Sequence, residues 1–125
     1  MTDSLDRLYQ QVLSAKDADP SVSRTARLLR SGRGKMAKKM AEEAVEVVID
    51  AMNGDREAVM RESADLLYNL VVLWVASDLR PADVWSEMKR REDLMGIAEK
   101  MPKNNSDSSR RKVVLLDARR SRKRR

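Results

Sequence analysis

The sequence predicts an all-α fold, an antiparallel bundle of four to five helices, and three observations carry this prediction. Glycine and proline are scarce, at 4 and 3 in 125 residues, which favours long helices over a turn-rich β architecture. Apolar residues recur at three- and four-residue steps, which is the period of an amphipathic helix. Short breaks rich in Pro, Gly, Asn and Asp separate these periodic segments, as expected between helices.

Helices are expected at residues 4–16, 23–30, 35–52, 56–77 and 82–91. Ser4 is the expected N-cap of the first, and residues 31–34 are expected to be a flexible loop because two glycines in three residues oppose a helix interior. Gly54 ends the third helix and Asp55 caps the fourth. Pro81 fits the first turn of the fifth. Because the turn around Gly54 is tight, the third and fourth helices should pack antiparallel.

The composition limits the side chains that could act in catalysis or bind a metal, because the chain contains neither cysteine nor histidine. Disulfides, thiolate metal sites and histidine bases are therefore excluded, and carboxylates, hydroxyls or water must do any acid–base work. The N-terminal residues show no signal-peptide pattern. The longest apolar stretch, residues 66–76, is interrupted by Asn69 and is shorter than the roughly 20 residues that span a bilayer. We expect a soluble, cytoplasmic protein that does not bind membranes.

The net charge of +6 is unevenly distributed along the chain. Residues 101–125 hold ten basic and two acidic residues, which leaves residues 1–100 with a net charge of −2. We therefore expect a folded domain over residues 1–100 and a disordered basic tail over 101–125. Such a tail binds nucleic acid nonspecifically at low salt. A nucleic-acid-binding or scaffold protein acting through the tail is the alternative of another class, and removal of the tail would distinguish it from an enzyme.

The most informative feature is a set of carboxylates on the third and fourth expected helices: Glu42, Glu43, Glu46, Glu62 and Asp65. Spacings of three and four residues stack these side chains on one face of each helix. Glu46 lies eight residues before Gly54 and Glu62 eight residues after it. With the same rise per residue on both helices, the two acidic groups reach the same height on the hairpin. The spacing predicts that four carboxylates face one another.

Such a cluster is costly without a cation, because like charges at this spacing repel and lose solvation near a helix interface. Hard divalent cations take oxygen ligands, and Mg²⁺ often binds a few carboxylates together with substrate phosphates. Without His or Cys, Mg²⁺ or Mn²⁺ fits better than Zn²⁺. The alternative is a solvated acidic face on which Glu43 and Glu46 pair with Lys39 and Lys38. Asp65 opposes this alternative, because it lies against an apolar run where a solvated charge gains nothing.

These residues resemble the all-α NTP pyrophosphatase superfamily, whose signature is Glu-Glu-x-x-Glu followed by Glu-x-x-Asp on an adjacent helix. The likeness is greatest to the phosphoribosyl-ATP pyrophosphatase branch and covers about residues 22–92. The stretches that carry it are residues 39–49, 53–56, 62–68 and 83–88. The resemblance implies Mg²⁺-dependent hydrolysis of phosphoribosyl-ATP to phosphoribosyl-AMP and pyrophosphate, the second step of histidine biosynthesis, by a homodimer.

The resemblance also implies residue roles. The metal ligands would be Glu43, Glu46, Glu62 and Asp65, and Glu42 would orient the attacking water or help bind a second metal. The chain has a strip of basic residues that would hold phosphates, namely Arg27, Arg30, Arg33, Lys35, Lys38 and Lys39. This basic strip and the family pattern together suggest the substrate-binding candidates Lys39, Lys35, Arg30, Ser23, Thr25 and Asn69. The branch usually has Gly where this chain has Ala41, and His where it has Asn69. A house-cleaning pyrophosphohydrolase acting on another nucleotide is therefore the alternative within the superfamily.

A homodimer or higher homo-oligomer is also expected from the residues themselves. From residue 66 to residue 75 the fourth helix is apolar nearly all round, and three short helices cannot readily cover it. Soluble monomers seldom expose more than a few hundred Å² of contiguous apolar surface. Burial against a second copy across a two-fold axis is the commonest solution.

Overall fold

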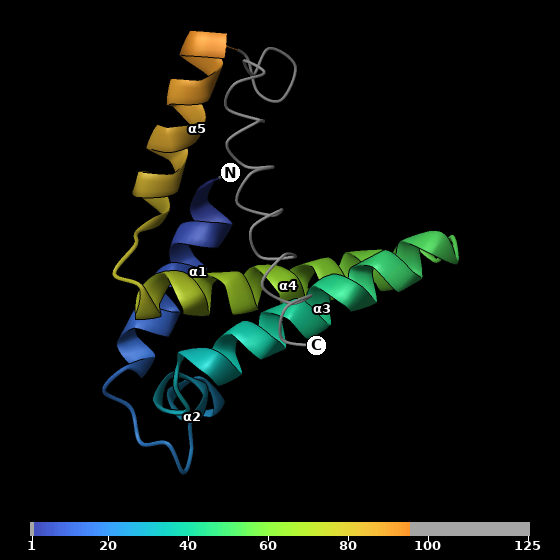
Figure 1. Cartoon of the computed structure of the whole chain (residues 1–125). Coiled ribbons are helices and arrows are strands. Elements are labelled where there is room, and N and C mark those ends of the chain that lie inside the picture. Colours follow the sequence, from blue (N-terminus) through green and yellow to red (C-terminus); the bar gives the residue numbers. More distant parts are fainter. Residues whose placement is uncertain (1, 96–125) are drawn as a thin grey trace, which may run out of the picture. The chain divides into compact units, whose positions relative to one another are not determined.

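The computed structural model describes residues 2–95 and contains five helices, with no strand in that range (Figure 1). The helices are α1 (Thr2–Ala15), α2 (Arg24–Arg30), α3 (Arg33–Met52), α4 (Arg56–Ala76) and α5 (Pro81–Met95). The predicted all-α class is therefore confirmed. Within the described range, no helix combines the length and the apolar character that crossing a membrane requires. The expected basic tail, residues 101–125, lies outside the described residues.

The chain divides into two compact units between Val84 and Trp85. The first unit contains α1 to α4 and the first turn of α5, and all residues of the site described below belong to it. The remainder of α5 belongs to the second unit and extends past the predicted end at Arg91. A side-chain pair supports this extension, because Lys89 Nζ donates to the Asp93 carboxylate at 2.9 Å across one helical turn. Earlier in the helix, Glu87 accepts hydrogen bonds from Arg90 and Arg91 at 2.7 and 2.9 Å. These pairs lower the pKa of Glu87 to about 2.

The α3–α4 hairpin is the frame of the first unit, and its two helices lie side by side and antiparallel (Figure 1). Gly54 takes the left-handed conformation, with φ of 71°. The amides of Gly54 and Asp55 donate to the carbonyls of Ala51 and Asp50 at 3.1 and 3.0 Å, which ends α3 in a Schellman motif. The Asp55 carboxylate accepts from the amide of Ala58 at 3.1 Å and caps α4. The predicted turn is confirmed, and it sets the register of the two helices.

The core lies where α1 and α2 pack against the end of the hairpin at which α3 begins and α4 ends (Figure 1). Val71 and Val72 of α4 are fully buried, and Val12 of α1 is 1 % exposed. Burying one such side chain contributes about 1.5–3 kcal/mol relative to exposure. The other buried apolar residues of the first unit's helices are Ala26, Leu28, Met36, Ala58, Trp74 and Val75. This packing fixes the position of α2 against α3 and α4.

Two helix starts differ from the sequence prediction by two residues. Ser4 is not the N-cap of α1, because the helix already begins at Thr2. The predicted loop of residues 31–34 is shorter than expected, because α3 begins at Arg33 and includes Gly34 in its first turn. The cost of glycine applies to a helix interior, whereas the first turn has N–H groups without helical partners in any case. Gly32 keeps the role of a turn glycine, with φ of 97°.

The exposed apolar surface lies elsewhere than the sequence suggested. Val71, Val72, Trp74 and Val75 are buried within one chain, so the expectation that this stretch needs a second copy is wrong for these residues. The reason is that α1 and α2 cover that part of α4. The large apolar side chains of α3 and α4 left exposed are Val45, Val48, Ile49, Met52, Met60 and Leu67.

Candidate metal centre and its pocket

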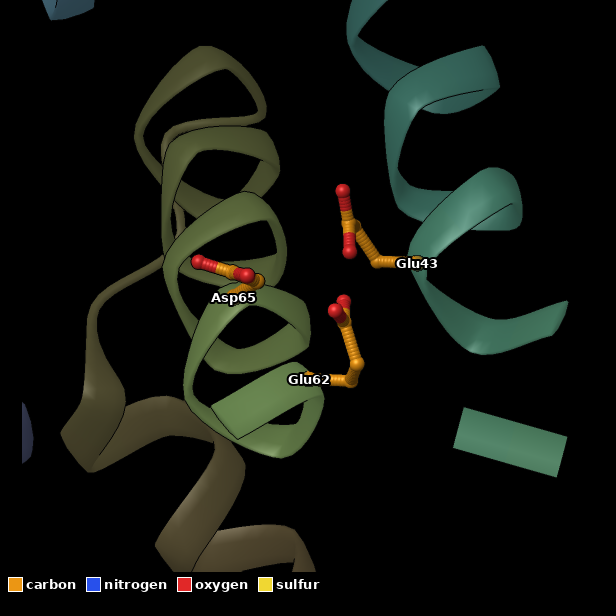
Figure 2. Close-up of side chains that lie close together, drawn as sticks. All are labelled: Glu43, Glu62 and Asp65. Carbon is orange, nitrogen blue, oxygen red and sulfur yellow. The ribbon is translucent and has the colours of Figure 1, made fainter. Parts of the chain in front are cut away.

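Three of the five predicted carboxylates meet between α3 and α4, and we call Glu43, Glu62 and Asp65 the carboxylate cluster (Figure 2). One oxygen from each lies within 4.8 Å of those from the other two. Figure 2 shows Glu43 reaching from α3 and Glu62 from α4 into the space between the helices. Glu43 and Glu62 are partly buried and Asp65 is exposed, so the cluster has one side open to a ligand.

The cluster carries unfavourable electrostatics. The pKa of Glu62 is raised, first by a side-chain hydrogen bond with Glu43, then by partial burial, and then by the negative charges of Glu43, Asp65 and Asp50. The ion pairs found among residues 4–94 lie on or next to α5, and none of them includes a cluster carboxylate. A set of oxygen ligands that repel one another fits a hard divalent cation such as Mg²⁺.

Glu42 and Glu46, the other two predicted site residues on α3, lie outside the cluster and are exposed. Successive helical residues are rotated by about 100°, so Glu42 points well away from the direction of Glu43. Glu46 is rotated by about 60° from Glu43 and lies about 4.5 Å further along the helix. The geometry therefore separates these two side chains from the three that converge.

A pocket of about 630 Å³ adjoins the cluster, and Glu43 and Asp65 form part of its wall. Its basic side chains come from two helices, Arg24 and Arg27 from α2 and Lys35 and Lys39 from α3. Its uncharged lining is Thr25, Leu28, Ser31, Tyr68 and Asn69. On α3, the four-residue steps from Lys35 to Lys39 and from Lys39 to Glu43 place basic and acidic groups in one row.

The structure divides the predicted substrate-binding residues into two groups. Four of them line the pocket: Lys35, Lys39, Thr25 and Asn69. Ser23 does not line it, and its hydroxyl instead accepts from the amide of Ala26 at 3.0 Å and caps α2. Arg30 lines a different pocket, of about 470 Å³, together with Lys16 and Arg33.

Three polar side chains of the pocket wall connect it to the rest of the fold. The hydroxyl oxygens of Thr25 and Tyr68 are 2.6 Å apart and share a hydrogen bond that joins α2 to α4. Asn69 is 6 % exposed, and its Nδ2 donates to the Asp65 carbonyl at 2.9 Å. The Asn69 Oδ1 atom is buried without a partner in the part of the chain that the structure describes. A buried acceptor without a hydrogen-bond donor lowers the free energy of unfolding by about 1–3 kcal/mol.

Sequence reasoning did not select Arg24, Ser31 or Tyr68 as site residues. Arg24 had a usable signal, because it lies three residues before Arg27 and therefore on the same side of a short helix. Tyr68 lies in residues 62–68, a stretch that carries the family resemblance, but nothing local indicated that it faces the pocket, because its partner Thr25 is 43 residues away in the chain. Only the packing of α2 against α4 brings the two together.

Comparison with known proteins agrees with this geometry. The sequence profile of a family described as phosphoribosyl-ATP pyrophosphohydrolase matches residues 5–92. A protein of Rhodopseudomonas palustris named phosphoribosyl-ATP pyrophosphatase 2 is 63% identical over 131 aligned residues, covering 100% of both chains. Its namesake in Bradyrhizobium diazoefficiens is 59% identical over 133 aligned residues, covering 99% of each chain. A phosphoribosyl-ATP pyrophosphatase of Granulibacter bethesdensis is 56% identical over 96 residues, covering 77% of this chain and 60% of that protein.

Proposed function

Because the chain belongs to the phosphoribosyl-ATP pyrophosphohydrolase family of hydrolases, we propose that it splits phosphoribosyl-ATP into phosphoribosyl-AMP and pyrophosphate. The single observation that supports this most directly is a carboxylate cluster that shares its pocket with four basic side chains. Carboxylates suit a metal ion and basic groups suit phosphates, so the pocket has the parts that a nucleotide pyrophosphohydrolase needs. The proposed reaction is the second step of histidine biosynthesis, and we place it in the cytoplasm.

The proposed reaction is a hydrolysis at the α-phosphorus. Water forms a new P–O bond there, and the bond from this phosphorus to the α–β bridging oxygen breaks. Pyrophosphate leaves with the electron pair of that bond, and the water gives up one proton. Glu42 is our proposed acceptor of this proton, since the chain has no histidine to act as base. Because Glu42 lies outside the carboxylate cluster in the single chain, this role is proposed from the family resemblance and not from the geometry.

Glu43, Glu62 and Asp65 would hold Mg²⁺, with Mn²⁺ as a substitute, and we propose Glu46 as a further ligand. When bound, the ion supplies positive charge that attracts the phosphate oxygens and stabilises the charge developing on them. Lys35 and Lys39 continue the row from Glu43 along α3, so they are suited to bind the same polyphosphate. Their ammonium groups would orient the substrate toward the cluster.

We also propose that the enzyme works as a homodimer that forms through the exposed apolar half of the hairpin. Four apolar side chains in this half are about half exposed or more in the single chain. On α3, Ile49 is 47 % exposed, Val48 59 % and Met52 82 %, and on α4, Met60 is 60 % exposed. Met52 lies four residues after Val48 and three after Ile49, so the three side chains share one side of α3. Exposed apolar side chains gathered in this way are typical of a contact with another protein. A second copy presents the same face, which makes a two-fold interface self-complementary.

A pyrophosphate-release assay tests the proposed function. The purified protein is offered phosphoribosyl-ATP, ATP and other nucleoside triphosphates with Mg²⁺, with Mn²⁺ or with excess EDTA. We expect turnover of phosphoribosyl-ATP with either metal, none in EDTA, and unchanged turnover when residues 101–125 are removed. Full activity in EDTA would contradict the proposed requirement for a metal ion. A preference for another triphosphate would identify a house-cleaning enzyme instead.

A further inference from the structure

The pocket holds two pairs of basic side chains, and only one pair lies in line with the carboxylate cluster. We infer that the other pair, Arg24 and Arg27 of α2, forms a second anion subsite that binds the phosphate of the substrate's added ribose. This inference rests on the proposed function and deepens it, because it assigns the choice of phosphoribosyl-ATP over ATP to two residues. It gives the two arginines a ligand of their own, whereas the proposed function counts them with the two lysines as groups suited to phosphates.

The first step of the argument is the placement of the two pairs. Lys35 and Lys39 lie on α3 in the row that ends at Glu43, where polyphosphate oxygens are required. Arg24 and Arg27 line the same pocket from α2, three residues apart and thus on one side of that helix. A polyphosphate that occupies the α3 row leaves the two arginines available for a separate anion.

The second step is that α2 is held firmly relative to the cluster. Its Thr25 hydroxyl shares the 2.6 Å hydrogen bond with Tyr68 of α4. Its Ala26 is fully buried and Leu28 is 8 % exposed. A helix fixed at these points presents Arg24 and Arg27 at a defined distance from the metal ligands, as a specificity subsite requires.

The third step is that the two guanidinium groups have donors to spare. Neither Arg24 nor Arg27 takes part in an ion pair found among the described residues. Arg27 donates from Nη1 to the Pro20 carbonyl at 2.8 Å, which orients the group and leaves most of its five N–H donors unused by that contact. The planar guanidinium matches two phosphate oxygens at once, so a pair of arginines suits a terminal phosphate.

The fourth step is the chemistry of the substrate. Phosphoribosyl-ATP carries a triphosphate and, on its added ribose, a separate monophosphate, whereas ATP carries the triphosphate alone. A pocket of about 630 Å³ is within the usual range for small-molecule sites, roughly 300–1,000 Å³. An enzyme that must distinguish these two nucleotides gains most by binding the group that only one of them has.

The test compares Arg24→Gln, Arg27→Gln and the double variant with wild type. Arg7→Gln is the control, because Arg7 is an exposed arginine of α1 that contacts Ser4 and does not line the pocket. Steady-state kcat and KM are measured for phosphoribosyl-ATP, and inhibition constants are measured for phosphoribosyl-AMP and for AMP. Thermal unfolding of each variant checks that the fold is kept, and the single variants suffice if the double variant does not fold.

We expect each single variant to raise KM for phosphoribosyl-ATP by about 10-fold or more, as for loss of a hydrogen bond to a charged group. The inhibition constant for phosphoribosyl-AMP should rise by a similar factor, while that for AMP and the value of kcat stay close to wild type. Arg24→Lys and Arg27→Lys should restore part of the affinity, because they keep the charge and lose the planar fork.

Two results would overturn the inference while leaving the proposed function intact. One is a wild-type KM in the double variant, and the other is an equal loss of affinity for AMP and phosphoribosyl-AMP. Either would show that the arginines do not recognise the added ribose phosphate. Failure of the wild-type protein to turn over phosphoribosyl-ATP is a different outcome, and it would overturn the proposed function together with the inference.

Discussion

The two halves of the α3–α4 hairpin both carry apolar side chains, yet α1 and α2 cover only one of these halves in the single chain. In the base, which we define as residues 33–42 and 66–76, Met36 is 3 % exposed and Val72 is fully buried. In the tip, residues 44–64, Val48 is 59 % exposed and Met52 is 82 % exposed. Figure 1 shows the cause, because α1 and α2 lie beside the base and the tip extends beyond them.

The difference between base and tip explains where the site lies. Glu43 and Asp65 are at the border between the two halves, and Glu62 is one turn into the tip. Partial burial there strengthens the repulsion that raises the pKa of Glu62, while the open side gives access to the pocket. Deeper in the base the carboxylates would lose too much solvation, and nearer the turn they would be too exposed to need a cation.

The largest expected effect is at the border itself. Changing Glu43→Gln, Glu62→Gln or Asp65→Asn should each lower turnover by more than about 100-fold, because groups that merely orient a metal ligand already contribute 10–100-fold. Glu57→Gln, an exposed change in the first turn of α4, is the matched control and should retain activity. The measurement is pyrophosphate release with saturating Mg²⁺. Near wild-type rates in the cluster variants would contradict the proposal that these carboxylates form a metal centre.

The next effect concerns the tip. Val48→Glu places a charge in the face that we propose a second copy covers, so it should convert a dimer into single chains of 14.3 kDa. Val22→Glu is the control, since Val22 is 81 % exposed in the segment between α1 and α2. Sedimentation equilibrium at micromolar concentration gives the mass. A wild-type protein with the mass of one chain would show that the tip is not a homodimer interface.

A smaller effect should distinguish the base from the tip by how much a buried or exposed valine in each contributes to the stability of the protein. Val72→Ala should lower the free energy of unfolding by about 1–3 kcal/mol at any protein concentration, because the lost methyl groups leave a cavity in the base. Val48→Ala should cost less than about 0.5 kcal/mol in a single chain. If a second copy covers the tip, the cost of Val48→Ala grows and depends on concentration. Urea unfolding at two protein concentrations distinguishes these cases.

The smallest effect is on the stability of the metal-free protein. The pKa of Glu62 is higher in the folded than in the unfolded chain, so its charge destabilises the fold at pH values above both. Glu62→Gln should therefore raise the thermal midpoint slightly in EDTA at pH 8. The difference should shrink as the pH falls through the raised pKa, because wild-type Glu62 then takes up a proton. A lower midpoint for the variant at pH 8 would contradict the repulsion.

Much of the fold was predictable because its signals are local. Helical periodicity predicted all five helices, and Gly54 with Asp55 predicted the turn that pairs α3 with α4. Equal spacing of Glu46 and Glu62 from Gly54 indicated that the carboxylates of two helices lie at similar heights. Each of these depends on residues close together in the chain, where the helix rise and the cap geometry are fixed.

Only the tertiary structure decided which members of each group face the same space. Glu43 rather than Glu46 approaches Glu62, because the rotation of each helix about its axis is set by how its side chains pack against the other helix. The same packing directs Arg27 into the site pocket and Arg30 into another one. It also joins Thr25 to Tyr68 across 43 residues. Spacing along a helix determines which residues share a side, whereas the direction of that side depends on neighbours distant in the sequence.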